Sequence, residues 1–90
     1  MTRSLRTPGH QALMQVLVET RKSKGITQQK LADCLDRPQS YVAKVEIGER
    51  RLDVVEFLQW SACTEAKPSE LIARVEHISA ELLEQDKNQK

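Results

Sequence analysis

Aromatic residues are scarce in this sequence: tryptophan, tyrosine and phenylalanine each occur once among 90 residues. Because β-sheets depend on aromatic and β-branched side chains, so few aromatics argue against a large β-sandwich. No apolar run approaches the roughly 18 residues that a membrane-spanning helix requires. Residues 1–6 also lack the apolar core of a signal peptide. We therefore expect a cytoplasmic protein.

The sequence also lacks the groups that enzymes use. It contains no glycine-rich phosphate loop, no Ser/His/Asp or Cys/His set, and no cluster with metal-ligand spacing. We expect no catalysis, no cofactor, no metal site and no small-molecule ligand. Cys34 and Cys63 stand apart from each other and from any histidine at ligand spacing, which is typical of a reduced cytosolic chain. Both are predicted to be reduced and to fill small spaces in the core.

Positive and negative charges are unevenly distributed along the chain, although the net charge is only +1. Residues 1–51 contain ten Lys and Arg against five Asp and Glu, and residues 52–90 contain four against eight. A basic half followed by an acidic half indicates a surface for a polyanion, with a chance distribution over solvated surfaces as the alternative. A chain of this length builds only a small core, so packing against a second copy would stabilise it.

Leu, Val, Ala, Gln, Glu, Lys and Arg dominate the composition, and apolar residues recur at spacings of three and four. Both features favour an all-α fold. Residues 1–9 contain two Arg, a Pro and a Gly without periodicity, so they are predicted to form a flexible basic arm. The predicted helices span residues 10–24, 27–36, 38–47, 53–64 and 68–86, and a polar tail follows at 87–90.

Several residues indicate where these helices begin and end. Thr27 can cap the second helix, and Asp53 has capping-box spacing with Glu56 at the start of the fourth. Asp36 tolerates the positive φ that the turn after the second helix requires, and Pro38 suits the first position of the third helix. Glycines at positions 25 and 48 favour helix ends.

Residues 27–48 thus contain two short helices joined by a tight turn. In such a pair the second helix can enter the major groove of DNA while the first crosses the phosphate backbone. Many helical hairpins share this periodicity, so the pattern alone makes the segment only a candidate for DNA binding.

The residues of this segment are more specific than its periodicity. Thr-Gln opens the first helix at 27–28, Leu-Ala lies in its middle at 31–32, Gln-Ser-Tyr opens the second at 39–41, and Lys-x-Glu-x-Gly closes it at 44–48. In this register the chain closely resembles the XRE/Cro-CI-like helix-turn-helix family over about residues 10–75. The resemblance implies a bacterial transcriptional regulator with a five-helix, lambda-repressor-like DNA-binding domain over 10–76 and a recognition helix over about 38–47.

Three positions depart from the family pattern. Asp36 replaces the usual glycine of the turn, and Thr64 and Glu65 stand where a leucine and a glycine are common. The turn before the last helix is therefore less certain than the helix-turn-helix itself, and none of the three lies on the recognition helix.

The resemblance also implies which residues contact DNA. Gln39, Ser40 and Lys44 are expected at base edges, where a Gln amide can pair with adenine N6 and N7 and a Lys can reach guanine O6 and N7. Gln28 is expected at a phosphate, near the N-terminus of its helix. The alternative for each is an ordinary solvated polar residue. Further phosphate contacts are expected from Arg37, Tyr41, Arg50 and Arg51.

Arg21 and Glu46 match the family positions that form an ion pair between the first helix and the end of the recognition helix. Such a pair would hold the recognition helix at a defined angle, and two unpaired surface charges are the alternative.

The predicted C-terminal helix at 68–86 has an apolar stripe with 4-3-4 spacing. So short a stripe serves either packing within the chain or a dimer seam. We expect a homodimer on palindromic double-stranded DNA, because half-sites about 34 Å apart suit two copies of one domain. The predicted seam residues are Leu71, Val75, Ile78 and Leu82.

The sequence leaves two other functions open. An antitoxin would bind its own promoter through residues 27–48 and a protein partner, such as a toxin, through the acidic C-terminal helix. A helical adaptor would not bind DNA at all. The sequence favours a transcriptional repressor over both.

Overall fold

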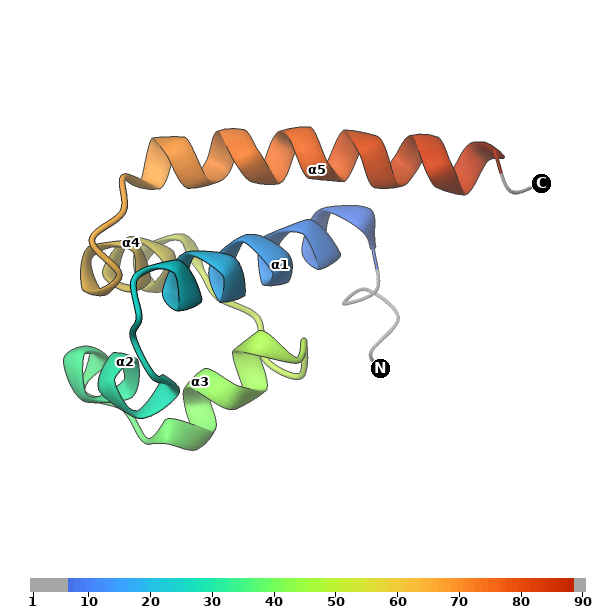
Figure 1. Cartoon of the computed structure of the whole chain (residues 1–90). Coiled ribbons are helices and arrows are strands. Elements are labelled where there is room, and N and C mark those ends of the chain that lie inside the picture. Colours follow the sequence, from blue (N-terminus) through green and yellow to red (C-terminus); the bar gives the residue numbers. More distant parts are fainter. Residues whose placement is uncertain (1–6, 89–90) are drawn as a thin grey trace.

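The computed structural model describes residues 7–88, with side chains described to residue 85, and helices are the only regular secondary structure in this part of the chain. The predicted all-α, five-helix fold is confirmed. Figure 1 shows α5 extending along one side of the molecule, beside α1, with α2 and α3 on the far side of α1. The helices are α1 (Pro8–Ser23), α2 (Gln28–Leu35), α3 (Gln39–Glu46), α4 (Val54–Cys63) and α5 (Pro68–Asn88).

The first helix begins earlier than predicted. Thr7 is its N-cap, with Oγ1 accepting a hydrogen bond from the His10 backbone N–H over 3.2 Å. Pro8 follows in the first turn, where its missing N–H costs nothing. Pro8 and Gly9 are therefore helical, and the prediction of an arm over 1–9 was wrong there. Residues 1–6 of that arm lie outside the described residues.

The turn between α2 and α3 has the predicted geometry at Asp36 but not at Pro38. Asp36 adopts a left-handed conformation with φ 58°, and its N–H bonds the carbonyls of the last turn of α2. Pro38 is not the first helical residue: it is the N-cap of α3, with an extended ψ of 153°. Since the N-cap precedes the helical dihedrals, α3 begins at Gln39.

The other predicted caps are present. Thr27 Oγ1 accepts from the Lys30 N–H over 3.0 Å. Asp53 and Glu56 form the capping box of α4, with reciprocal bonds of 2.7 and 2.9 Å. After α4, Glu65 takes a left-handed conformation with φ 57°, as a glycine would, so the turn forms despite this departure from the family pattern.

The core lies where α1, α2, α3 and α4 meet, and α5 closes it. Trp60, Leu31 and Val42 are completely buried. Tyr41 packs beside Trp60, with ring centroids 6.0 Å apart, and is only 8% exposed. From α5, Leu71 joins the core directly. The inner side of α3, the predicted recognition helix, thus packs on a continuous apolar cluster.

A disulfide joins Cys34 to Cys63, with Cα atoms 5.9 Å apart. The prediction of two reduced core cysteines was therefore wrong, and Cys34 is in fact exposed. The bond connects the last turn of α2 to the last residue of α4. Because the two cysteines are 29 positions apart in the sequence, only the packing of α2 on α4 brings them together.

Within residues 7–88, no helix combines the length and the apolar character that a membrane span requires. The His, Cys, Asp and Glu side chains of the same residues form no group of three or more that could hold a metal ion.

Candidate nucleic-acid interface

The predicted recognition helix, α3, has one buried and one exposed side. Tyr41, Val42 and Val45 face the core. The predicted base-contacting residues Gln39, Ser40 and Lys44 are all exposed. This division follows from helical periodicity, since inward positions recur every three to four residues. The structure therefore leaves a short, polar helix surface open to solvent.

The end of α3 is tied to α1 by a buried ion pair. Arg21 Nε lies 2.7 Å from Glu46 Oε2, and Arg21 Nη2 donates to Glu46 Oε1 over 3.1 Å. The side chains are only 10% and 5% exposed. Arg21 Nη1 also donates to the Ile26 carbonyl over 2.8 Å, so the guanidinium contacts the segment before α2 as well. Arg21 thus connects α1 to the segment before α2 and to the end of α3.

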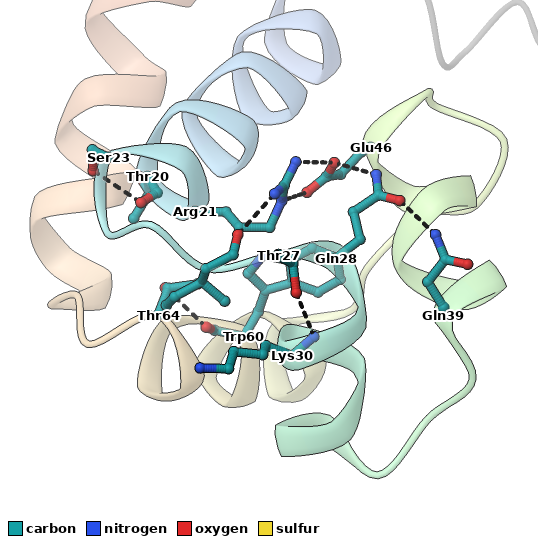
Figure 2. Close-up of polar contacts among 11 residues, drawn as sticks. Thr20, Arg21, Ser23, Thr27, Gln28, Lys30, Gln39, Glu46, Trp60 and Thr64 are labelled. Carbon is teal, nitrogen blue, oxygen red and sulfur yellow. Dashed lines mark hydrogen bonds and ion pairs between the residues drawn. The ribbon is translucent and has the colours of Figure 1, made fainter.

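This ion pair continues through two amides to the start of α3, as Figure 2 shows. Gln28 Nε2 donates to Glu46 Oε1 over 2.8 Å. That bond turns Gln28 Oε1 toward α3, where it accepts from Gln39 Nε2 over 2.8 Å. Gln28 is therefore mainly a link between Glu46 and Gln39, a role that the sequence did not suggest. An amide has a second N–H, so a phosphate contact by Gln28 remains chemically available.

The link leaves Gln39 with the groups that base contact requires. One of its two Nε2 hydrogens is used by Gln28, and the described residues provide no bond to its Oε1. A Gln amide needs one N–H and one carbonyl oxygen to pair with an adenine edge. Gln39 therefore keeps both groups while its side chain is held in one direction.

A second cluster lies beside α3 and contains Arg37, Arg50, Tyr41 and Glu56. Arg50 forms a bidentate pair with Glu56, with N–O distances of 3.0 and 2.9 Å, and Arg37 Nη2 lies 3.5 Å from the same carboxylate. Both guanidinium carbons lie over the Tyr41 ring, 4.5 and 4.9 Å from its centroid. The arginine side chains remain 42% and 40% exposed, so they can still contact a phosphate.

The electrostatics of this cluster follow from these contacts. The hydrogen bond with Arg50, the Asp53 backbone and the two arginine charges lower the pKa of Glu56. Burial and the Glu56 carboxylate raise the pKa of Tyr41, against the opposing effect of the arginines. Glu56 was predicted only as a capping residue, and its ionic role could not be inferred from sequence. Tyr41, predicted as a phosphate contact, contributes its ring mainly to the core.

The predicted dimer seam on α5 is mostly occupied within the chain. Leu71 is only 3% exposed, and Val75 and Ile78 pack against the core cluster. Arg74 reinforces this packing by pairing with Glu19 of α1 over 2.8 Å. Leu71 therefore cannot form an intermolecular seam, because α5 packs on α1 and α4 at this end of the stripe. Leu82 is half-buried.

The two short helices, their tight turn and the exposed polar side of α3 define a helix-turn-helix DNA-binding protein. The chain is similar to an XRE-family like protein from Pseudomonas syringae pv. tomato str. DC3000, with 42% identity, 84% of this chain and 93% of that chain covered, and a TM-score of 0.76. It is also similar to the restriction-modification controller protein C.AhdI from Aeromonas hydrophila, with 35% identity, coverage of 67% and 91%, and a TM-score of 0.62.

This chain therefore belongs to the XRE family of helix-turn-helix DNA-binding transcriptional regulators, and not to a family of enzymes. The clp gene regulator ClgR from Corynebacterium glutamicum shares the fold, with 19% identity, coverage of 88% and 84%, and a TM-score of 0.80. No protein-family model and no curated protein matches the sequence.

Proposed function

We propose that this protein is a cytoplasmic repressor that binds a palindromic DNA operator as a homodimer. The observation that carries the proposal is the hydrogen-bonded chain from Arg21 through Glu46 and Gln28 to Gln39. It holds a side chain suited to adenine at the exposed start of α3. Repression requires only that the bound protein occupy the operator, which a small DNA-binding domain can do.

Base contacts are assigned to Gln39, Ser40 and Lys44, since all three are exposed on α3. Each good contact contributes about 1–3 kcal/mol of discrimination against a wrong base. Phosphate contacts are assigned to Gln28 and to the arginines at positions 37, 50 and 51. The Tyr41 hydroxyl is a weaker candidate, because the residue is only 8% exposed.

The proposed homodimer has the symmetry that the proposed palindromic operator requires. Two half-sites one helical turn apart, about 34 Å, require two recognition helices related by a two-fold axis. Leu71 is buried inside the chain, so of the predicted stripe only the partly exposed Val75, Ile78 and Leu82 can contribute to contact between the two copies.

A second candidate function is that of an antitoxin, which would bind a toxin through α5 and its own promoter through α3. One observation favours it: the outward side of α5 is exposed and acidic. The acidic residues that form this side are Glu70, Glu76, Glu81 and Glu84.

Selection of bound DNA from a random library tests the proposed function. We expect a palindromic site for the wild type, and for Gln39→Ala the same site with relaxed preference at one base pair in each half. Ser23→Ala, a change at the end of α1, is the control and should select the wild-type site. Selection of no defined sequence by the wild type would exclude specific operator binding. A site that Gln39→Ala selects with unchanged preference would exclude Gln39 as a base contact.

A further inference from the structure

The disulfide between Cys34 and Cys63 joins two helices that build different parts of the candidate DNA-binding site, since α2 packs on α4 (Figure 1). From α2, Gln28 bonds the side chain of Gln39. From α4, Glu56 binds both arginines of the cluster beside α3. The bond therefore connects the helix that orients the first residue of α3 to the helix that carries the arginine cluster.

A permanent disulfide does not suit the compartment in which the proposed function places the chain. In the cytoplasm, glutathione and thioredoxin keep thiols reduced. The disulfides that form there in mesophilic organisms are usually transient, and they serve catalysis or redox sensing. The chain uses no catalytic cysteine for DNA binding, so a bond that forms and breaks reversibly indicates redox sensing.

The two sulfur atoms differ in how easily solvent reaches them. Cys34 is exposed in the last turn of α2, whereas Cys63 is half-buried and packs against the core cluster. Thiol–disulfide exchange depends on access of the attacking group to a sulfur, and exposed disulfides are the labile and regulatory ones. A small thiol can therefore attack this bond at Cys34, and Cys63 lies within the chain as the partner that closes it again.

We propose that Cys34 and Cys63 form a thiol–disulfide exchange site, at which a low-molecular-weight thiol and its disulfide control the affinity of the protein for DNA. The oxidised protein is the form that binds tightly. This inference rests on the DNA binding of the proposed function and adds its regulation.

Oxidation proceeds in two exchange steps. The Cys34 thiolate attacks a sulfur of the small disulfide, so that Cys34 carries a mixed disulfide and one small thiol is released. The Cys63 thiolate then attacks the Cys34 sulfur and expels the second small thiol. An electron pair passes from the protein to the small disulfide, and the protons of the two cysteine thiols end on the two released thiols. An excess of the small thiol reverses both steps.

Reduction frees the end of α2 but leaves its buried side in place. Leu31 and Ala32 of α2 are completely buried in the same core cluster as Trp60 of α4, so the two helices stay packed without the bond. Beyond the end of α2, Arg37 Nη2 lies 3.5 Å from Glu56, and the arginine side chain is 42% exposed. Because an exposed ion pair contributes little, the end of α2 is held much less firmly in the reduced protein.

The affinity for DNA depends on how many groups are already in position before binding. Contact with DNA requires Gln39 and the arginine cluster to be placed at the same time, and ordering them during binding lowers the affinity. A disulfide pre-orders such groups in the free protein. We therefore expect reduction to weaken DNA binding while the core of the fold persists.

Titration of the full chain with its selected DNA site, in glutathione buffers from fully reducing to fully oxidising, tests the proposal. We expect the reduced wild type to bind about tenfold more weakly than the oxidised wild type. The variant with both Cys34→Ser and Cys63→Ser should bind like the reduced wild type in every buffer. The single variants form a matched pair for the exchange step: with glutathione disulfide, Cys63→Ser should acquire glutathione faster than Cys34→Ser, as measured by mass spectrometry, because it retains the exposed cysteine.

Three results would overturn the proposal. They are equal affinities of the oxidised and the reduced wild type, tighter binding by the reduced form, and a bond that stays oxidised in every glutathione buffer. Weaker binding that accompanies a loss of helicity by circular dichroism would overturn it too, because the bond would then only hold the fold. Equal affinities for a defined DNA site would leave the proposed function standing, whereas a protein that selects no DNA site in either redox state would remove that function and its regulation together.

Discussion

Gln39 Nε2 donates a hydrogen bond to Gln28 Oε1 over 2.8 Å, and so joins the first residue of the recognition helix to α2. Gln28 is in turn bonded to Glu46, which forms the buried ion pair with Arg21. The direction of the side chain assigned to base contact is therefore set by the same residues that hold α3 in place.

The first prediction concerns Gln28. Gln28→Ala removes the bond that orients Gln39, so discrimination at the base contacted by Gln39 should fall about fivefold, which corresponds to about 1 kcal/mol for one hydrogen bond. Competition binding with operators changed at single base pairs measures this. Gln29→Ala is the control, since Gln29 bonds only Asp33 within its own helix. If Gln28 served only as a phosphate contact, affinity would instead fall equally for all sequences.

The second prediction concerns the ion pair. Glu46→Ala leaves the Arg21 guanidinium buried without its carboxylate, so the free energy of unfolding should fall by about 3–5 kcal/mol. Urea unfolding measures the loss. Arg21→Met combined with Glu46→Leu removes both charges and should recover much of that stability, because neither charge then remains unpaired. A single Glu46→Ala variant as stable as the wild type would show that the pair does not hold α3.

The third prediction concerns the loss of stability at acidic pH that Glu56 causes. Its pKa is lower in the folded protein than its ordinary value of 4.5, chiefly because Arg50 hydrogen-bonds the carboxylate. The folded state therefore binds the proton less tightly than the unfolded state, and stability falls as the pH drops below about 4.5 toward the folded pKa.

Urea unfolding at a series of pH values compares the wild type with Glu56→Gln. The variant should lose part of the acid sensitivity, because its side chain does not titrate in this range. Glu49→Gln, at an exposed position, is the control and should retain the wild-type profile. Identical profiles for wild type and Glu56→Gln would contradict the assignment.

The fourth prediction concerns the disulfide. Reducing the bond between Cys34 and Cys63, which are 29 positions apart, should lower the free energy of unfolding by about 3–4 kcal/mol, since the unfolded chain regains the entropy of the open loop. Unfolding with and without dithiothreitol measures this. A variant with both Cys34→Ser and Cys63→Ser should match the reduced wild type and not respond to the reductant. Equal stability of oxidised and reduced wild type would mean that the bond contributes nothing to folding.

The sequence by itself determined the helices and the family. Helical spacing, the caps at Thr27 and Asp53, and the left-handed turn at Asp36 are local properties, set by dihedral preferences and by side chains bonding nearby backbone groups. Periodicity along α3 likewise placed Gln39, Ser40 and Lys44 on its exposed side. The one-residue error at Pro38 has a local cause too, because a proline fits both the N-cap and the first helical position.

Only the tertiary structure decided which distant residues meet. The pairing of Cys34 with Cys63, the attachment of Glu56 to Arg37 and Arg50, and the link from Glu46 to Gln39 each depend on how helices pack. The apolar stripe of α5 is another feature that the sequence alone leaves undecided, because its spacing suits packing on a neighbouring helix of the chain or on a second copy. Packing on α1 took Leu71 into the core and left Val54, Leu58 and Ile72 outside, because each helix can bury only the side that its neighbours cover.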